Sequence, residues 1–252
     1  MMPTLPQSLL DRPIAHRAYH DAHAGRPENS RAAIVAAIEA GYGIEMDLQL
    51  SSDGQAMVFH DYDLKRLTVA KGAIRQRTAA ELGTITLRYS DETVPSLVEV
   101  LDLVAGRVPL LIELKDQDGA MGPNVGPLEE ATAAALKPYQ GEVALMSFNP
   151  HSARRMAELA PDRPRGITTC SYSAKDWLML NKATRDRLRA IPDFDSVPAD
   201  FISHKHKALN APRVQELRAR GVPILCWTIR SPTEEAAARL IADNVTFEGY
   251  VA

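Results

Sequence analysis

Short apolar runs alternate with amphipathic runs along almost the whole chain. The apolar runs favour β-structure and predict strands at residues 13–17, 43–50, 108–115, 142–148, 166–170, 199–204, 223–229 and 245–250. The amphipathic runs predict helices at residues 30–40, 96–105, 128–136, 150–159, 174–190, 211–220 and 232–242. Strands that alternate with helices predict a parallel sheet with helical crossovers. The glycine-rich phosphate turn of an open doubly wound sheet is missing after the first strand, so a closed α/β barrel, the (β/α)8 or TIM barrel, is favoured.

Two stretches depart from this alternation. Residues 51–94 carry a further short strand at 56–60 and no clean crossover helix, which predicts a small insertion above the barrel mouth after the second strand. The sequence stops after the eighth strand, so the eighth outer helix is expected to be missing or replaced by residues 5–10. No repeat, low-complexity tract or linker divides the sequence, and one domain over residues 1–252 is expected.

Composition narrows the range of partners. The net charge of −3 and the pI of about 6.2 provide no basic field for nucleic acid or an anionic membrane. No basic-apolar leader begins the sequence, and no apolar run approaches the roughly 18 residues of a spanning helix, so no membrane anchor and a cytoplasmic location are expected. Cys170 and Cys226 are expected to be buried free thiols, and a homo-oligomer is compatible with the sequence.

Charged residues interrupt three successive apolar strands at the ends that form the functional face of a barrel. Side chains alternate along a strand, so Glu45 and Asp47 point the same way, as do Glu113 and Lys115. Three converging carboxylates suit a hard divalent cation, Mg²⁺ or Ca²⁺, better than Zn²⁺. The alternative is that these acids form structural ion pairs with Arg17 and Lys115; as a set, they favour a site.

Two histidines accompany the acids. His16 lies at the end of the first strand, and His60 follows the strand at 56–60, from which it can lean over the barrel mouth towards His16. Imidazoles titrate near neutral pH, so a pair beside a phosphate is suited to general acid and general base roles. Either histidine alone would be typical of a structural residue, and it is the pairing that favours catalysis.

The motifs occur in an order that resembles the glycerophosphodiester phosphodiesterase family. They are His16-Arg17, Pro27-Glu28-Asn29-Ser30, Glu45-Met46-Asp47, Ser52-Asp53-Gly54, His60-Asp61 with Leu64-Lys65-Arg66-Leu67-Thr68, Glu113-Leu114-Lys115, Ser147-Phe148 and Cys226-Trp227-Thr228. Each motif is weak alone, whereas the ordered series is highly specific.

The resemblance implies a role for each matching residue. Glu45, Asp47 and Glu113 would hold the metal, His16 and His60 would be the catalytic pair, and Arg17 and Lys115 would contact the phosphate. Glu28 would lie near the metal or hold its loop, although capping of the first helix accounts for it equally well. Trp227 would form an apolar wall for the substrate alcohol, or else a core aromatic residue.

Two departures from the family pattern bear on the substrate entrance. Ala18 stands where the family has glycine, which would matter if that position needs an unusual φ. The last strand ends Thr246-Phe247-Glu248-Gly249-Tyr250 instead of Thr-Asp-x-Pro, which leaves the closure of the site by the C-terminus undefined. His20, His23 and the His204-Lys205-His206 segment could touch substrate, but exposed loops are the favoured interpretation.

The predicted function is metal-dependent hydrolysis of glycerophosphodiesters to glycerol 3-phosphate and an alcohol. One alternative is the same chemistry on a lysophospholipid or sphingolipid, as a lysophospholipase D or sphingomyelinase D would perform it; the sequence shows no anchor or exposed amphipathic aromatic segment for such substrates. A second alternative is a non-catalytic barrel that only binds. A third is a sugar-phosphate isomerase barrel in which the acids form ion pairs and bind no metal.

Overall fold

Eight parallel strands close into a barrel in the computed structural model, which describes residues 4–252. Closure is complete because β1 pairs with β9 on one side and with β2 on the other. The barrel strands are β1 (Ile14–Ala15), β2 (Gly43–Leu50), β4 (Leu110–Leu114), β5 (Val143–Ser147), β6 (Arg165–Thr169), β7 (Phe201–Lys205), β8 (Ile224–Ile229) and β9 (Asn244–Phe247). The predicted (β/α)8 barrel is confirmed.

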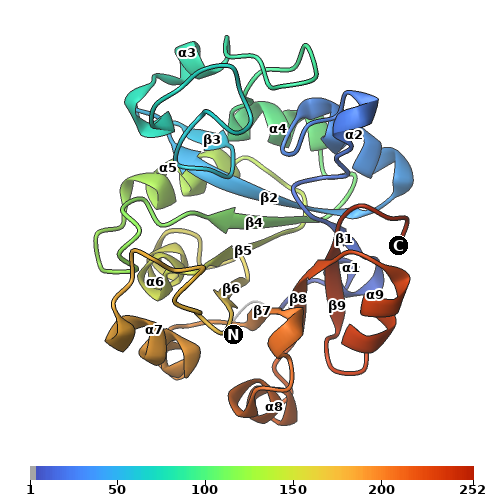
Figure 1. Cartoon of the computed structure of the whole chain (residues 1–252), viewed down its shortest axis with the longest axis vertical. Coiled ribbons are helices and arrows are strands. Elements are labelled where there is room, and N and C mark those ends of the chain that lie inside the picture. Colours follow the sequence, from blue (N-terminus) through green and yellow to red (C-terminus); the bar gives the residue numbers. More distant parts are fainter. Residues whose placement is uncertain (1–3) are drawn as a thin grey trace.

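Helices follow the strands around the outside of the barrel (Figure 1). They are α2 (Arg31–Ala40), α4 (Leu97–Val104), α5 (Pro127–Leu136), α6 (Pro150–Leu159), α7 (Lys182–Arg189), α8 (Pro212–Ala219) and α9 (Pro232–Ala238). Side-chain caps explain where several of them begin: Ser30, Asn149 and Ser231 each accept a hydrogen bond from a backbone N–H of the first turn. Ser96 and Glu99 form a reciprocal capping box at the start of α4.

The predicted helix at 174–190 is wrong in its first half. Only α7 is helical there, and it begins after Asn181, whose side chain accepts a hydrogen bond from the N–H of Thr184 at 2.9 Å. The preceding residues 171–181 form turns. Trp177 and Leu180 from these turns pack with Tyr172 in an apolar cluster, so tertiary contacts account for a pattern that resembled helical amphipathicity.

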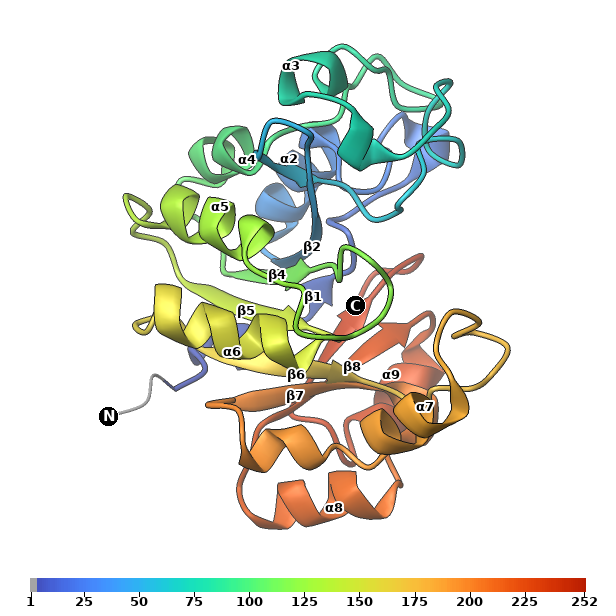
Figure 2. The ribbon, with the colours of Figure 1, turned by 90° about the vertical axis from the view of Figure 1, so that its left-hand side faces the viewer.

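The insertion after β2 carries its own small core. β3 (Ala56–Val58) pairs antiparallel with β2, and η2 (Ile74–Gln76) and α3 (Ala79–Leu82) follow it. Figure 2 shows this segment at the α3 end of the molecule, beyond the barrel strands. Its buried apolar side chains form a separate cluster made of Met57, Phe59, Leu64, Ile74, Leu82, Leu87 and Val94. The insertion is thus a folded unit that continues the sheet by one strand.

The N-terminal segment plugs the barrel instead of joining the outer ring. Leu9, in α1 (Ser8–Asp11), is buried in one cluster with Leu111, Phe201 and Leu225 from the barrel interior. Asn244 of β9 donates to the carbonyls of Leu9 at 2.8 Å and Arg12 at 2.6 Å. No helix follows β9 within the described chain, so the eighth outer helix is missing, which was one of the two predicted outcomes, and residues 5–10 do not replace it.

Two further expectations concern the cellular location and the number of domains. Among residues 4–252, no helix combines the length and apolarity needed to cross a bilayer. That residues 1–252 form one domain, and that the protein is cytoplasmic, stay predictions.

Gly166 allows the barrel interior to close around Phe201, with which it is paired in the β6–β7 register. A Cβ built on Gly166 would lie 2.4 Å from the Phe201 ring. We predict that Gly166→Ala lowers the free energy of unfolding by about 1–3 kcal/mol, because overpacking forces the ring off its rotamer. Chemical denaturation measures this, with Gly122→Ala as the control, since a Cβ on Gly122 meets nothing within 4 Å. Equal stability of the two variants would contradict the overpacking.

Candidate active site

Three buried carboxylates converge at the carboxyl end of neighbouring strands. Glu45 and Asp47 lie on β2, and Glu113 lies opposite Asp47 in the register of β4. All three are at most 5% exposed, and one oxygen from each lies within 4.8 Å of the others. The sequence prediction that these acids converge is therefore met by the geometry, and such an all-oxygen set has the chemistry that a hard divalent cation needs.

Two cations compensate part of this charge. Lys115 donates to Asp47 Oδ1 at 2.7 Å and also to Glu113. Arg17 places its Nε 3.6 Å from Asp47 Oδ2, but its terminal nitrogen is bound to Glu28 at 2.7 Å. Ion pairs and a cation site are thus not exclusive alternatives, because two basic residues compensate only part of the charge of three acids.

Glu45 is the carboxylate that remains uncompensated. It accepts the backbone N–H of Arg17 at 2.8 Å and has no Lys or Arg partner among the described residues. Burial, with the neighbouring charges of Asp47 and Glu113, raises the pKa of Glu45 well above its usual value. Burial would also raise the pKa of Asp47, but Lys115, His60 and Arg17 hold it far below its usual value. A cluster that must hold either a proton or another cation fits a divalent metal.

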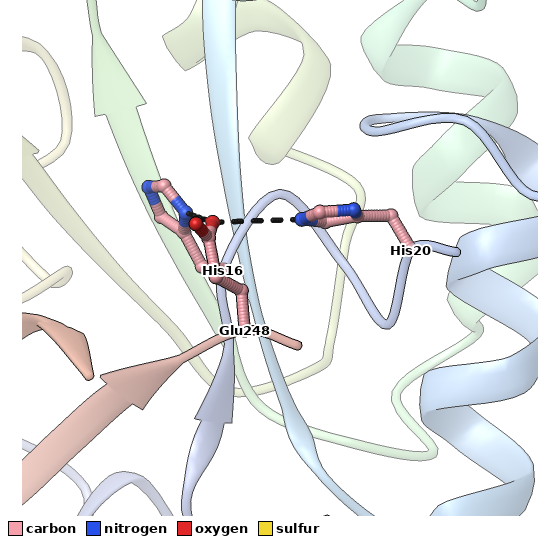
Figure 3. A group of neighbouring side chains, drawn as sticks. All are labelled: His16, His20 and Glu248. Atoms are coloured by element: carbon pink, nitrogen blue, oxygen red, sulfur yellow. Dashed lines mark hydrogen bonds and ion pairs between the residues drawn. The ribbon is translucent and has the colours of Figure 1, made fainter. Parts of the chain in front are cut away.

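His16 is anchored by a carboxylate from the last strand. Its Nδ1 donates to Glu248 Oε2 at 2.5 Å, and its Nε2 faces Glu45 at 4.0 Å. Figure 3 shows Glu248 between the rings of His16 and His20, whose Nε2 lies 3.6 Å from the same oxygen. Burial raises the pKa of Glu248, but hydrogen bonds from His16 and His20 outweigh it and hold the pKa far below its usual value. Burial in turn lowers the pKa of His16, so the ring is neutral near pH 7.

His60 has a matching anchor. It follows β3, and its Nδ1 lies 2.7 Å from Asp61 Oδ1. Asp61 is itself held by Arg66 at 2.6 Å and 2.8 Å. A carboxylate at Nδ1 fixes the ring and its tautomer and leaves Nε2 as the nitrogen that can exchange a proton. Both histidines therefore carry the arrangement expected of an acid–base pair.

The three acids, the two histidines, Arg17 and Lys115 line one cavity of about 350 Å³. Its lining includes His16, Arg17, Glu45, Asp47, His60, Glu113, Lys115 and Trp227. The structure thus brings together every sequence-predicted site residue except Glu28. Glu28 lies behind Arg17 and bridges it to Arg66 at 2.7 Å. Because Ser30 caps α2, the capping interpretation of Glu28 is wrong, and the residue ties the first loop to the insertion.

The loop after β1 keeps a left-handed backbone at Ala18. The φ of Ala18 is 65°, and that of Arg17 before it is 51°. The family glycine would favour this region, so alanine retains the backbone path at the expense of strain. The unusual φ is thus present at this position. In this conformation the backbone N–H of Arg17 donates to the Glu45 carboxylate, and the N–H of Ala18 donates to the Glu45 carbonyl at 2.9 Å.

Comparison with known proteins decides the family. Residues 16–246 match the model of the glycerophosphoryl diester phosphodiesterase family. The chain belongs to this family. A glycerophosphodiester phosphodiesterase of Caldanaerobacter subterraneus is 31% identical over 81% of this chain and 80% of its own length. One from Bacillus subtilis is 26% identical over 76% of this chain and 68% of its own length.

Solved structures share the fold. A phosphodiesterase of Oleispira antarctica in complex with the product sn-glycerol-3-phosphate is 24% identical, covers 96% of this chain and 94% of that chain, and has a TM-score of 0.75. A glycerophosphodiester phosphodiesterase of Thermotoga maritima is 22% identical, covers 94% of both chains, and has a TM-score of 0.69. The family prediction made from the ordered motifs is confirmed.

Several residues near this phosphodiesterase site were not assigned a role from the sequence. Glu248 is 232 positions from His16, and only its departure from the family motif drew attention to it. Asn29 donates to Asp47 Oδ2 at 3.0 Å, and a φ of 60° aims it inward. Asp61 and Arg66 stand in the quoted motif after His60, so the motif itself was the signal for them.

The remaining histidines singled out in the sequence were predicted to lie in exposed loops, and the structure confirms this for some of them only. His20 joins Glu248, whereas His23 is exposed in η1 (Ala22–Ala24). The exposed-loop interpretation is wrong for His204, which is 2% exposed on β7 and shares a 2.7 Å hydrogen bond with Thr169. Lys205 and His206 are half-buried and line the cavity, so the exposed-loop interpretation does not fully hold for them either.

His204 makes stability depend on pH. Burial lowers the pKa of His204 to about 4 from 6.5. As the pH falls below 6.5, the unfolded chain binds a proton that the folded chain refuses, so stability is lost down to about pH 4, below which both states are protonated. We predict that the unfolding free energy of the wild type falls by about 3 kcal/mol more than that of His204→Gln across this window. Denaturant titrations at each pH measure it, and parallel profiles would refute it.

Proposed function

We propose that the protein hydrolyses glycerophosphodiesters to glycerol 3-phosphate and an alcohol, with His16 and His60 as the acid–base pair. The observation that carries the proposal is the convergence of two carboxylate-anchored imidazoles, three acids and two cations on one cavity. Family membership and the product bound to the Oleispira antarctica protein support the substrate class. The substrate would be a small molecule.

Glu45, Asp47 and Glu113 would hold a divalent cation, Mg²⁺ or Ca²⁺. When bound there, the cation supplies positive charge that orients the phosphate and stabilises charge developing on its oxygens. Arg17 and Lys115 line the same wall of the cavity and would contact the phosphate as well. Lys115 and Arg17 compensate only part of the charge of the three acids, and Glu45 has no Lys or Arg partner among the described residues, so a bound cation would supply the charge that these residues lack.

Proton transfer falls to the two imidazoles. One Nε2 would take the proton of the nucleophile, which is water or a neighbouring substrate hydroxyl, and the other would donate to the leaving alkoxide. Burial keeps His16 neutral, so at neutral pH it is suited to accept a proton first. Glu248 and Asp61 then stabilise the imidazolium forms without giving up their own charge.

The non-catalytic alternative predicts that neither histidine matters. We expect His16→Ala and His60→Ala each to lower kcat by about 10²–10⁴-fold while the melting temperature changes little, because each removes one proton-transfer group. Release of glycerol 3-phosphate from glycerophosphoethanolamine is the measurement, and His23→Ala is the control because His23 is exposed outside the cavity. Glu248→Gln should lower kcat less and leave KM near wild type. Near-normal turnover in either alanine variant would exclude the mechanism.

Removal of the metal has a readout besides activity. With Mg²⁺ or Ca²⁺ at about 100 times its Kd, the folded state should gain about 2.7 kcal/mol by mass action. Thermal unfolding with and without EDTA measures this shift, which Glu45→Gln should abolish and the exposed Glu39→Gln should keep. EDTA should also stop turnover, and either ion should restore it. An isomerase-like barrel with ion pairs alone would show no shift.

A further inference from the structure

A second cavity adjoins the catalytic one. It measures about 630 Å³ and shares six lining residues with the catalytic cavity: His60, Glu113, Lys115, Phe148, Lys205 and Trp227. We call it the side groove. A volume of this size is in the range of pockets that enclose a small organic ligand. Because Lys115 lines both cavities, a substrate whose phosphate contacts Lys115 can extend one of its substituents into the side groove.

The side groove is walled by aromatic rings. The centroid of Phe148 lies 5.0 Å from that of Trp177 and 5.5 Å from that of Trp227. Met121 and the adjacent residues Leu178 and Met179 complete the apolar wall. The loop after β4 closes against the loop before α7, since a Cβ on Gly119 would lie 3.0 Å from the Met179 side chain. Two barrel loops therefore form an apolar channel beside the reacting groups.

The rim of the side groove exposes apolar surface. Leu178 is 84% exposed and Met179 is 74% exposed, and among the described residues no other large apolar side chain is as exposed as Leu178. Clustered apolar exposure beside a pocket marks a binding surface more often than chance. This rim lies in the part of residues 174–190 that was predicted to be helical and forms turns instead.

The carboxylates around the side groove differ in their partners. Asp61 binds His60 and Arg66, and Asp176 lies 3.5 Å from Lys205. Asp116 accepts from Asn149 at 2.7 Å, and Asp63 accepts from the backbone N–H of Lys65 at 2.8 Å. The part of the catalytic cavity outside the side groove presents polar groups suited to the hydroxyls of glycerol, namely His206, Lys207, Thr228, Arg230 and Thr246.

We propose that the side groove binds an apolar chain or ring carried by one alcohol of the phosphodiester, so that the preferred substrate bears an apolar substituent instead of a small polar head group. This inference rests on the proposed function for the position of the phosphate. Its occupant follows from three observations: a wall shared with the phosphate-binding cavity, aromatic and thioether side chains along the groove, and an exposed apolar rim.

The two tryptophans of the chain provide a direct probe. Trp177 and Trp227 are the only ones in the sequence, and both line the side groove. We propose to titrate the full-length protein in Mg²⁺ buffer with n-alkyl phosphates from ethyl to decyl, following tryptophan fluorescence and calorimetric Kd. Each added methylene should lower Kd by about two- to fourfold until the groove is filled. The fluorescence change should grow along the same series.

A matched pair of variants locates the effect. The double variant Leu178→Ser with Met179→Ser should flatten the dependence of Kd on chain length, because it removes apolar surface from the rim. Leu240→Ser removes an equally exposed apolar side chain (74%) elsewhere and should keep the wild-type slope. A flat series in the wild type, unchanged tryptophan fluorescence, or an unchanged slope in the double variant would overturn the inference. The inference would also be overturned if the double variant kept the wild-type slope and differed only in its oligomeric state in solution, because the rim would then serve self-association.

A separate arm keeps the two proposals distinguishable. Hydrolysis of glycerophosphoethanolamine, which carries no apolar substituent, tests the proposed function without the side groove. If alkyl phosphates bind with the expected slope but no diester is hydrolysed, the proposed function fails and the side groove stands. If the diester is hydrolysed and the slope is flat, only the side groove fails.

Discussion

The burial of three carboxylates at the mouth of the barrel is the constraint on which the surrounding structure depends. Glu45, Asp47 and Glu113 cannot all remain charged there without compensation, since unpaired buried charge is very costly. Lys115 and Arg17 neutralise part of the charge, and Asn29 adds a hydrogen bond to Asp47. The rest appears as the raised pKa of Glu45. The negative charge that remains is what a bound divalent cation would neutralise.

Barrel closure is also a feature of the site. His16 follows the first strand and Glu248 follows the last, and they meet because β1 and β9 are hydrogen-bonded neighbours. Glu28 performs a similar task on the other side, where it joins Arg17 to Arg66 of the insertion. Residues from other segments of the chain therefore hold His16 and Arg17 in place, whereas His60 is held by its neighbour in sequence, Asp61.

The sequence predicted the barrel, the acid cluster and the histidine pair, because strand alternation places Glu45 with Asp47 on one face and short motifs survive in order. It could not predict the anchor of His16. Nothing local connects Glu248 to His16, since their contact exists only when the strands close. The helix at 174–190 failed for a related reason: Trp177 and Leu180 are spaced as in a helix but are buried by tertiary contacts with neighbouring loops. Long-range packing is what a local pattern leaves out.

The small core of the insertion bears on how the enzyme responds to heating. His60 follows β3, which is shared between two cores: Met57 belongs to the cluster of the insertion, as does Phe59 after the strand, whereas Ala56 and Val58 belong to the barrel core. Segments with their own limited packing open more readily than the molecule as a whole. The position of His60 therefore depends on the packing of the insertion as well as on that of the barrel, and on heating we expect its alignment to be lost before the strands that hold the acids unfold.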